Sequence, residues 1–139
     1  MNFDVRMHLG TLGMTGALLV AAVAAIRPNV RAVREIGRHV PLAIELDVVE
    51  IGNVRRFDAA TPVEIGRAAS GVSLKDPEVS RKHARLESRD GIAYVVDLDS
   101  RNGTFLNGRL VDEPIEIRAG DSIDIGTARL QVRSVQPWT

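Results

Sequence analysis

The pattern of apolar and polar positions divides this chain into two parts with different periods. From Leu9 to Ile26, eighteen residues pass without a charge and are rich in Ala, Leu and Val. From Leu42 onward, apolar and polar residues alternate in short runs, and turn-forming pairs such as Asp-Gly and Asn-Gly separate the runs. A long apolar run is typical of a membrane span, and alternation is typical of half-buried strands. The pattern therefore predicts an N-terminal transmembrane helix followed by an all-β domain.

The apolar run at residues 9–26 is just long enough to cross a bilayer, because a helix of that length reaches about 27 Å. Residues 1–8 form a short tail before it, with Arg6 as its basic residue. Four arginines follow the run closely: Arg27, Arg31, Arg34 and Arg38. The positive-inside rule places the more basic flank in the cytoplasm. We therefore expect a single-pass membrane protein with its N-terminus outside and its large domain in the cytoplasm.

Two other interpretations of residues 9–26 stay open. A cleaved signal peptide would use Ala22-Val23-Ala24 as its small-residue site, and the domain would then be exported. Asp4 precedes the run, however, and most arginines lie after it, which is the reverse of a signal peptide. A buried core helix is also compatible with so short a run, which contains three glycines.

Small residues recur at every fourth position of the expected span: Gly13, Ala17, Ala21 and Ala25. They would form a smooth face against which other transmembrane helices can pack. Residues 27–41 then form a basic juxtamembrane linker that ends at Pro41. Its valines recur at helical spacing opposite its arginines, which predicts an amphipathic helix on an anionic membrane surface. A solvated linker is the alternative.

The remaining residues, about 42–136, are typical of one domain of short strands. Runs at 42–51 and 54–57 predict a hairpin that turns at Gly52-Asn53. Eight further runs follow at 61–67, 73–74, 84–88, 93–98, 104–106, 115–117, 122–125 and 128–135. Many short strands without a convincing helix predict a β-sandwich. Its expected core is Ile65, Val79, Leu86, Val95, Leu98, Phe105, Ile117, Ile123, Ile125, Leu130 and Val132.

Composition and charge exclude several classes of function. The chain has 139 residues and no cysteine, which excludes disulfides, zinc knuckles and thiol nucleophiles. The net charge is zero, but residues 41–139 carry thirteen Lys and Arg against sixteen Asp and Glu, which disfavours nucleic-acid binding. The sequence shows no nucleophile paired with a base, no glycine-rich phosphate loop and no metal-ligand cluster. We therefore expect no enzymatic activity, no cofactor and no metal.

Three predicted turns of the β-domain carry groups that suit an anion. Gly66-Arg67 supplies a guanidinium, Ser80-Arg81-Lys82-His83-Ala84 supplies a hydroxyl and another guanidinium, and Asn102-Gly103 supplies a turn. A phosphothreonine carries close to two negative charges and three acceptor oxygens, so its site needs a guanidinium, a short donor and little competing acid. Arg67 and Ser80 meet that need.

Four segments occur in a fixed order: Gly66-Arg67, Ser80 to Ala84, Asp97 to Gly108, and Gly120 to Gly126. In order and spacing they resemble the forkhead-associated (FHA) domain family, and the resemblance covers about residues 42–136. It implies a β-sandwich of about eleven short strands that binds phosphothreonine peptides through loops at one end. The implied peptide-binding residues are Arg67, Ser80, Arg81, Arg101 and Asn102.

The resemblance assigns each of these residues a role. Arg67, Ser80 and Arg101 match positions on the phosphate side, and Arg81 matches a position that touches phosphate or peptide backbone. Asn102 matches an asparagine whose amide holds the peptide main chain, and it also suits a left-handed turn. His83, which has no motif-spaced partner, is expected to hydrogen-bond across the base of the loops.

Further residues are expected to shape the site or to stay outside it. Thr104 is expected to order its loop, and Asn107 to form a hairpin turn below the site. The sequon Asn102-Gly103-Thr104 is read as accidental in a cytoplasmic domain. Residues 68–72 are slightly short for the family, which leaves the path of that loop open. Asp76 and Glu78 are expected to face water, because inward they would repel phosphate.

These inferences combine into a membrane-anchored module that recruits a phosphothreonine-containing kinase substrate to the cytoplasmic face of the membrane. The alternative is a small structural subunit of a larger membrane complex, in which the FHA-like cap is a phosphate-independent interaction surface.

Overall fold

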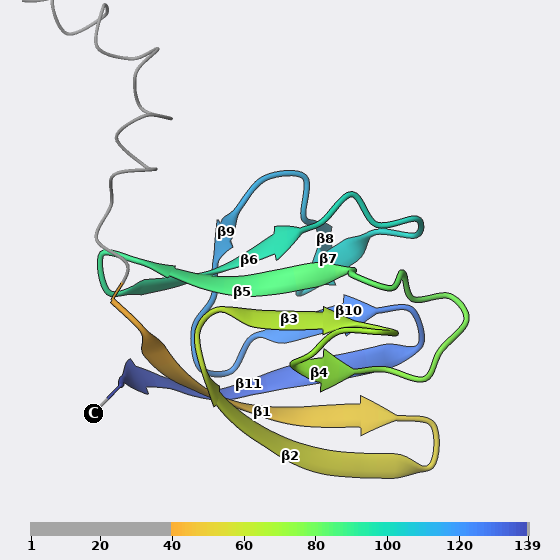
Figure 1. Ribbon diagram of the computed structural model, residues 1–139, viewed down its shortest axis with the longest axis horizontal. Coiled ribbons are helices and arrows are strands. Elements are labelled where there is room, and N and C mark those ends of the chain that lie inside the picture. The colour runs from red at the N-terminus through yellow and green to blue at the C-terminus, as the bar shows by residue number, and fades with distance from the viewer. Residues whose placement is uncertain (1–39, 139) are drawn as a thin grey trace, which may run out of the picture. The chain divides into compact units, whose positions relative to one another are not determined.

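The computed structural model describes residues 40–138, which form eleven strands in two facing sheets (Figure 1). The strands are β1 (Leu42–Glu50), β2 (Asn53–Ala60), β3 (Val63–Gly66), β4 (Val72–Ser73), β5 (Ala84–Arg89), β6 (Ile92–Asp97), β7 (Thr104–Leu106), β8 (Arg109–Leu110), β9 (Ile115–Glu116), β10 (Ser122–Ile125) and β11 (Ala128–Pro137). One sheet has the order β2-β1-β11-β10-β7-β8, and the other has the order β4-β3-β5-β6-β9. The predicted β-sandwich is confirmed for this part of the chain.

Alternation of side chains decides which face of each strand enters the core. In β1 the side chains of Leu42, Ile44, Leu46 and Val48 are buried, and those between them are not. Because successive side chains of a strand point to opposite faces, this pattern turns one face of β1 toward the second sheet. The β1–β2 hairpin turns at Ile51-Gly52, one residue earlier than predicted, so β2 is longer than the predicted run.

The same alternation corrects two residues of the predicted core. Thr104 and Leu106 of β7 are buried, so Phe105 between them points outward and is 37% exposed. Leu98 follows the end of β6 and is only half-buried. The other predicted core residues are buried: Ile65, Val79, Leu86, Val95, Ile117, Ile123, Ile125, Leu130 and Val132. The prediction for Phe105 was wrong because it rested on apolarity alone, whereas the polar Thr104 beside it is the residue that enters the core.

Strand boundaries also differ from the predicted ones in places. The run 61–67 contains a shorter strand, β3, and Arg67 lies in the turn that follows it. The two-residue strand β8 was not predicted, and β11 continues to Pro137. The expected tail at 1–8, the span at 9–26 and all but the last two residues of the linker at 27–41 lie outside the described residues. Residues 40–138 include no helix long and apolar enough to cross a membrane.

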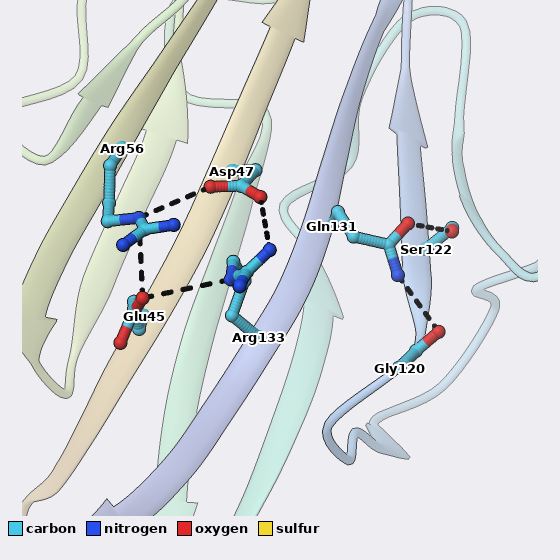
Figure 2. A network of polar contacts seen from close by, with 7 residues as sticks. All are labelled: Glu45, Asp47, Arg56, Gly120, Ser122, Gln131 and Arg133. Carbon is cyan, nitrogen blue, oxygen red and sulfur yellow. Dashed lines mark hydrogen bonds and ion pairs between the residues drawn. The ribbon is translucent and has the colours of Figure 1, made fainter.

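The outer face of the larger sheet carries a closed set of ion pairs (Figure 2). Arg56 Nε lies 3.3 Å from Glu45 Oε1 and 3.4 Å from Asp47 Oδ1, and Arg133 Nη1 lies 3.0 Å from Asp47 Oδ2. Such exposed pairs contribute little stability, about 0–1 kcal/mol each. Their consequence is electrostatic, because each of the two guanidinium groups is neutralised by neighbouring carboxylates.

Three loops and a turn gather at one end of the sandwich. They are the β3–β4, β4–β5 and β6–β7 loops and the β10–β11 turn, and Figure 1 shows them on the right. The described part of the chain begins and ends on the other side, where Trp138 N donates a hydrogen bond to Pro41 O at 3.3 Å. The end that carries the loops is therefore free of both chain ends of the described domain.

Candidate functional site

The β3–β4 and β4–β5 loops are joined through their backbones. Arg67 N donates to Ser80 O and Ala68 N donates to Arg81 O, both at 3.0 Å. Gly66 permits this approach, since a Cβ at that position would lie 2.2 Å from Arg81 O. Glycine is the residue for such close backbone contact. The Gly-Arg and Ser-Arg motifs, which are fourteen residues apart, therefore meet because the glycine has no side chain.

Ser80 is the point at which three loops meet. Its backbone carbonyl accepts from Arg67, and its hydroxyl oxygen accepts from Arg101 N at 3.0 Å. Its own N–H donates to His83 Nδ1 at 3.1 Å. A serine hydroxyl has one proton besides its two lone pairs. Since the hydroxyl oxygen acts as an acceptor toward Arg101, its proton is available to donate to an incoming acceptor.

His83 is fully buried and links the loops from below. A backbone N–H can only donate, so Nδ1, which faces Ser80 N, carries no proton. In the neutral ring the proton then lies on Nε2, which donates to Gly103 O at 2.9 Å. Both ring nitrogens are thereby occupied, and the contacts are those of a residue that holds the β4–β5 loop against the β6–β7 loop.

The positive charge of the described domain is concentrated near these loops. Eight of its thirteen lysines and arginines pair with a carboxylate. Within residues 40–138, the five without a carboxylate partner are Arg67, Lys75, Arg81, Arg101 and Arg109. Four of these five lie on the β3–β4, β4–β5 and β6–β7 loops. Unpaired guanidinium groups beside a free hydroxyl proton are suited to a phosphate dianion.

The guanidinium of Arg67 is held by one of its nitrogens. Nε donates to Val79 O at 3.2 Å, which leaves the two terminal nitrogens free. Val79 is buried, so the carbonyl that holds Arg67 is itself fixed by the core. Arg81 and Arg101 are exposed. Arg67 is exposed as well, so the loops carry three exposed guanidinium groups, of which that of Arg67 is oriented by a hydrogen bond.

Asn102 contacts a residue that was expected to face water. Its Nδ2 donates to the backbone carbonyl of Glu78 at 2.8 Å and to the Glu78 carboxylate at 3.0 Å. Glu78 is exposed, as expected, but its carboxylate also accepts a hydrogen bond from the Asn102 amide. A contact between residues twenty-four positions apart leaves no signal in the sequence.

Asp76 does not simply face water either. Its carboxylate accepts hydrogen bonds from Thr127 N at 2.8 Å, from Thr127 Oγ1 at 2.7 Å and from Glu78 N at 2.9 Å. The bonds from the Thr127 backbone, the Thr127 hydroxyl and the Glu78 backbone hold the pKa of Asp76 below its ordinary value. Asp76 therefore ties the β4–β5 loop to the β10–β11 turn.

Asp97 orders the β6–β7 loop and was not among the predicted site residues. It accepts from the Ser100 hydroxyl and the Thr104 hydroxyl, both at 2.6 Å, and from Ser100 N at 3.0 Å. Burial alone would raise the pKa of Asp97, but these hydrogen bonds lower it below its ordinary value. The sequence pattern that could have indicated this role is an aspartate followed by a serine three residues later, which is typical of turns closed by side chains.

The structure places Asn107 away from the other predicted residues. It lies at the end of β7 opposite to Asn102, with a positive φ of 49°. Its Nδ2 donates to Asp121 Oδ1 at 3.0 Å, and its Oδ1 accepts from Ser122 N at 2.9 Å. Thr104 is fully buried. The loops thus bring together Arg67, Ser80, Arg101, Asn102 and His83, whereas Asn107 fastens the β7–β8 turn to β10.

Comparison with known proteins agrees with this geometry. The FHA domain family model matches residues 63–126. The FHA domain-containing protein FhaB of Mycolicibacterium smegmatis is 33% identical over 120 residues, which make up 86% of this chain and 77% of FhaB. Domains of this family are phosphopeptide-binding interaction modules, which recognise phosphorylated motifs through clusters of arginines. The chain belongs to the FHA domain family.

Two solved structures show such domains with partners. The FhaA FHA domain, crystallised with the intracellular domain of Rv3910, is 29% identical with a TM-score of 0.58 and covers 65% of this chain and 99% of that one. The yeast Dun1 FHA domain, in complex with a doubly phosphorylated peptide derived from Rad53, is 27% identical with a TM-score of 0.56, covering 73% and 79%. Both of these similar FHA domains therefore bind a partner, and the peptide bound to the Dun1 domain contains phosphothreonine.

Proposed function

We propose that this chain binds phosphothreonine peptides through Arg67, Ser80, Arg81, Arg101 and Asn102. The observation that carries the proposal is the pairing of cations in the described domain. Four loop cations are without a carboxylate, and three of them, Arg67, Arg81 and Arg101, accompany the free hydroxyl proton of Ser80. A phosphate dianion neutralises that charge, and charge-assisted hydrogen bonds are the stronger kind. Asn102 lies beside these groups and holds the peptide main chain.

The test is binding of a degenerate phosphothreonine peptide library to the full chain, followed by affinity measurements on a selected peptide. Arg67→Ala is expected to weaken binding at least about ten-fold, because a hydrogen bond to a charged group contributes about 1.5–3 kcal/mol. Ser80→Ala is expected to act in the same direction. The unphosphorylated peptide should not bind measurably.

Arg109→Ala is the matched control, because Arg109 is also exposed and unpaired within residues 40–138 but lies on β8. Equal losses of affinity for Arg67→Ala and Arg109→Ala would show that the effect comes from the net charge of the domain and not from the site. Equal binding of phosphorylated and unphosphorylated peptide would overturn the proposal in favour of a phosphate-independent surface, such as that of a structural subunit.

We further propose that residues 9–26 anchor this module in a membrane, with residues 1–8 outside and the β-domain at the cytoplasmic face. Eighteen uncharged residues followed by four nearby arginines support this orientation. The described part of the β-domain begins on the side opposite to its site loops (Figure 1). A face of Gly13, Ala17, Ala21 and Ala25 is then available to other transmembrane helices.

The absence of cysteine makes the orientation directly measurable. In intact cells, a membrane-impermeant maleimide should label Asn2→Cys, and it should label Ser134→Cys only after permeabilisation. Labelling of Ser134→Cys in intact cells would overturn the proposed orientation. Loss of residue 2 from the mature protein would instead indicate a cleaved signal peptide.

A further inference from the structure

Glu78 occupies both hydrogens of the Asn102 amide. The two atoms that face this amide group, the Glu78 carbonyl oxygen at 2.8 Å and the Glu78 carboxylate oxygen at 3.0 Å, are both acceptors. The atom that faces them must therefore be the nitrogen, which has two hydrogens. One hydrogen serves each acceptor. The amide oxygen of Asn102 is the atom left for a ligand.

The backbone of Glu78 is fixed on both sides, so it can act as a rigid support. Its N–H donates to Asp76 Oδ1 at 2.9 Å, and Asp76 is bound to Thr127 at 2.8 and 2.7 Å. The next residue, Val79, is buried and donates its N–H to Asp76 O at 3.0 Å. The carbonyl that holds Asn102 therefore belongs to a loop fastened to the core and to the β10–β11 turn.

We propose that Glu78 is a positioning residue of the phosphopeptide site, which fixes Asn102 as a hydrogen-bond acceptor for a main-chain N–H of the peptide. This inference rests on the proposed phosphothreonine function. An amide that is free to rotate can present either its oxygen or its nitrogen to a peptide. The two bonds to Glu78 remove that choice before the peptide arrives, and pre-organisation of this kind lowers the cost of binding.

Two substitutions separate the orienting role of Glu78 from its charge. Glu78→Gln keeps a side-chain acceptor for Asn102 and loses the charge, so the phosphopeptide should bind with at least the wild-type affinity. Glu78→Ala loses the side-chain acceptor and should bind about three- to ten-fold more weakly, the effect of about one hydrogen bond. Glu113→Ala, at an exposed acid of the β8–β9 loop, is the matched control and should leave the affinity unchanged.

A second measurement reports on the bond itself and not only on affinity. The measurement uses a series of phosphopeptides, each N-methylated at one main-chain nitrogen. For one of them, N-methylation should weaken binding to the wild type but should not weaken binding to Asn102→Ala. In Glu78→Ala, that N-methylation should cost less than in the wild type. A general loss of stability would not make the effect of one peptide N–H depend on Glu78.

The contact is also measurable without a peptide, which separates this inference from the proposed function. In the free full chain, the Asn102 side-chain amide protons should exchange with water more slowly in the wild type and in Glu78→Gln than in Glu78→Ala. If no phosphopeptide binds the wild type, the proposed function fails, whatever the exchange result. If phosphopeptides bind the wild type but Glu78→Ala binds equally well, or Glu78→Gln is as weak as Glu78→Ala, the positioning role is overturned.

Discussion

At the scale of single residues, the site depends on residues that let its loops pack closely together as much as on residues that would contact a peptide. Gly66 has no atom that would touch a ligand, yet its missing side chain lets the Arg67 and Ser80 segments exchange hydrogen bonds. His83 has the chemistry of a catalyst, yet both of its nitrogens are used to hold loops together. The residue type alone therefore says less about function than the partners of each atom.

Gly66→Ala should destabilise the domain and weaken phosphopeptide binding together. The new methyl group would lie 2.2 Å from Arg81 O, a backbone atom that cannot move aside by a side-chain rotation. We expect a loss of about 1–3 kcal/mol in the free energy of unfolding, the usual range for overpacking. Urea denaturation measures this loss.

Gly52→Ala is the comparison, because Gly52 has a φ of +73° but nothing lies near the position of its Cβ. This substitution should cost about 1 kcal/mol of stability without affecting peptide affinity. An equal effect of both changes on affinity would contradict this explanation.

At the scale of elements, two of the three loops of the site are each ordered by a carboxylate at the base of the loop. Asp76 ties the β4–β5 loop to the β10–β11 turn, and Asp97 closes the β6–β7 loop through Ser100 and Thr104. Both carboxylates carry a lowered pKa, because neutral donors surround them. Hydrogen bonds to neutral donors therefore stabilise the ionised form of both acids close to the proposed phosphopeptide site.

The stability supplied by Asp97 should depend on pH. Its pKa is lower in the folded chain than the ordinary value of 3.8, so the ionised form favours folding above that value. The contribution is lost as pH falls through the folded pKa. Asp97→Asn should lower the free energy of unfolding by about 1–3 kcal/mol at pH 7, and the difference from the wild type should shrink below about pH 4. Denaturation at a series of pH values measures it, with the exposed Asp112→Asn as control; a constant difference down to pH 2 would rule out the carboxylate as the cause.

At the scale of the whole described domain, charge is distributed unevenly although the chain as a whole is neutral. Apart from Arg109 on β8, the cations on the strands are paired with carboxylates, as Figure 2 shows for Arg56 and Arg133 of the larger sheet. On the site loops, Lys82 pairs with Glu64, but Arg67, Lys75, Arg81 and Arg101 have no carboxylate partner among the described residues. Pairing on the strands prevents the rest of this surface from competing for the same anions. Four of the five unpaired cations of the described residues therefore lie on the loops at one end of the sandwich.

Phosphopeptide affinity should fall with salt through the loop arginines. The screening length shortens from about 10 Å at 0.1 M to about 3 Å at 1 M ionic strength, so we expect affinity to drop about three- to ten-fold over that range. Arg81→Ala should make the dependence shallower because it removes one exposed charge of the site. Arg109→Ala should leave the slope as it is in the wild type. Titrations by fluorescence anisotropy at several salt concentrations measure the slopes, and identical slopes for all three proteins would contradict a local origin of the charge.

The sequence by itself determined the sandwich and most of its buried positions, because alternation and turn residues are local properties of a chain. It also indicated the binding chemistry, since Gly66-Arg67, the Ser80 segment and Asn102-Gly103 are contiguous motifs. Only the tertiary structure decided which motif residues meet, placing Asn107 at the far end of β7 and turning Phe105 outward. It also decided that Glu78 holds Asn102 and that Asp76 holds Thr127. These contacts join residues whose pairing depends on how loops close in three dimensions, and no period or local spacing in the sequence records that closure.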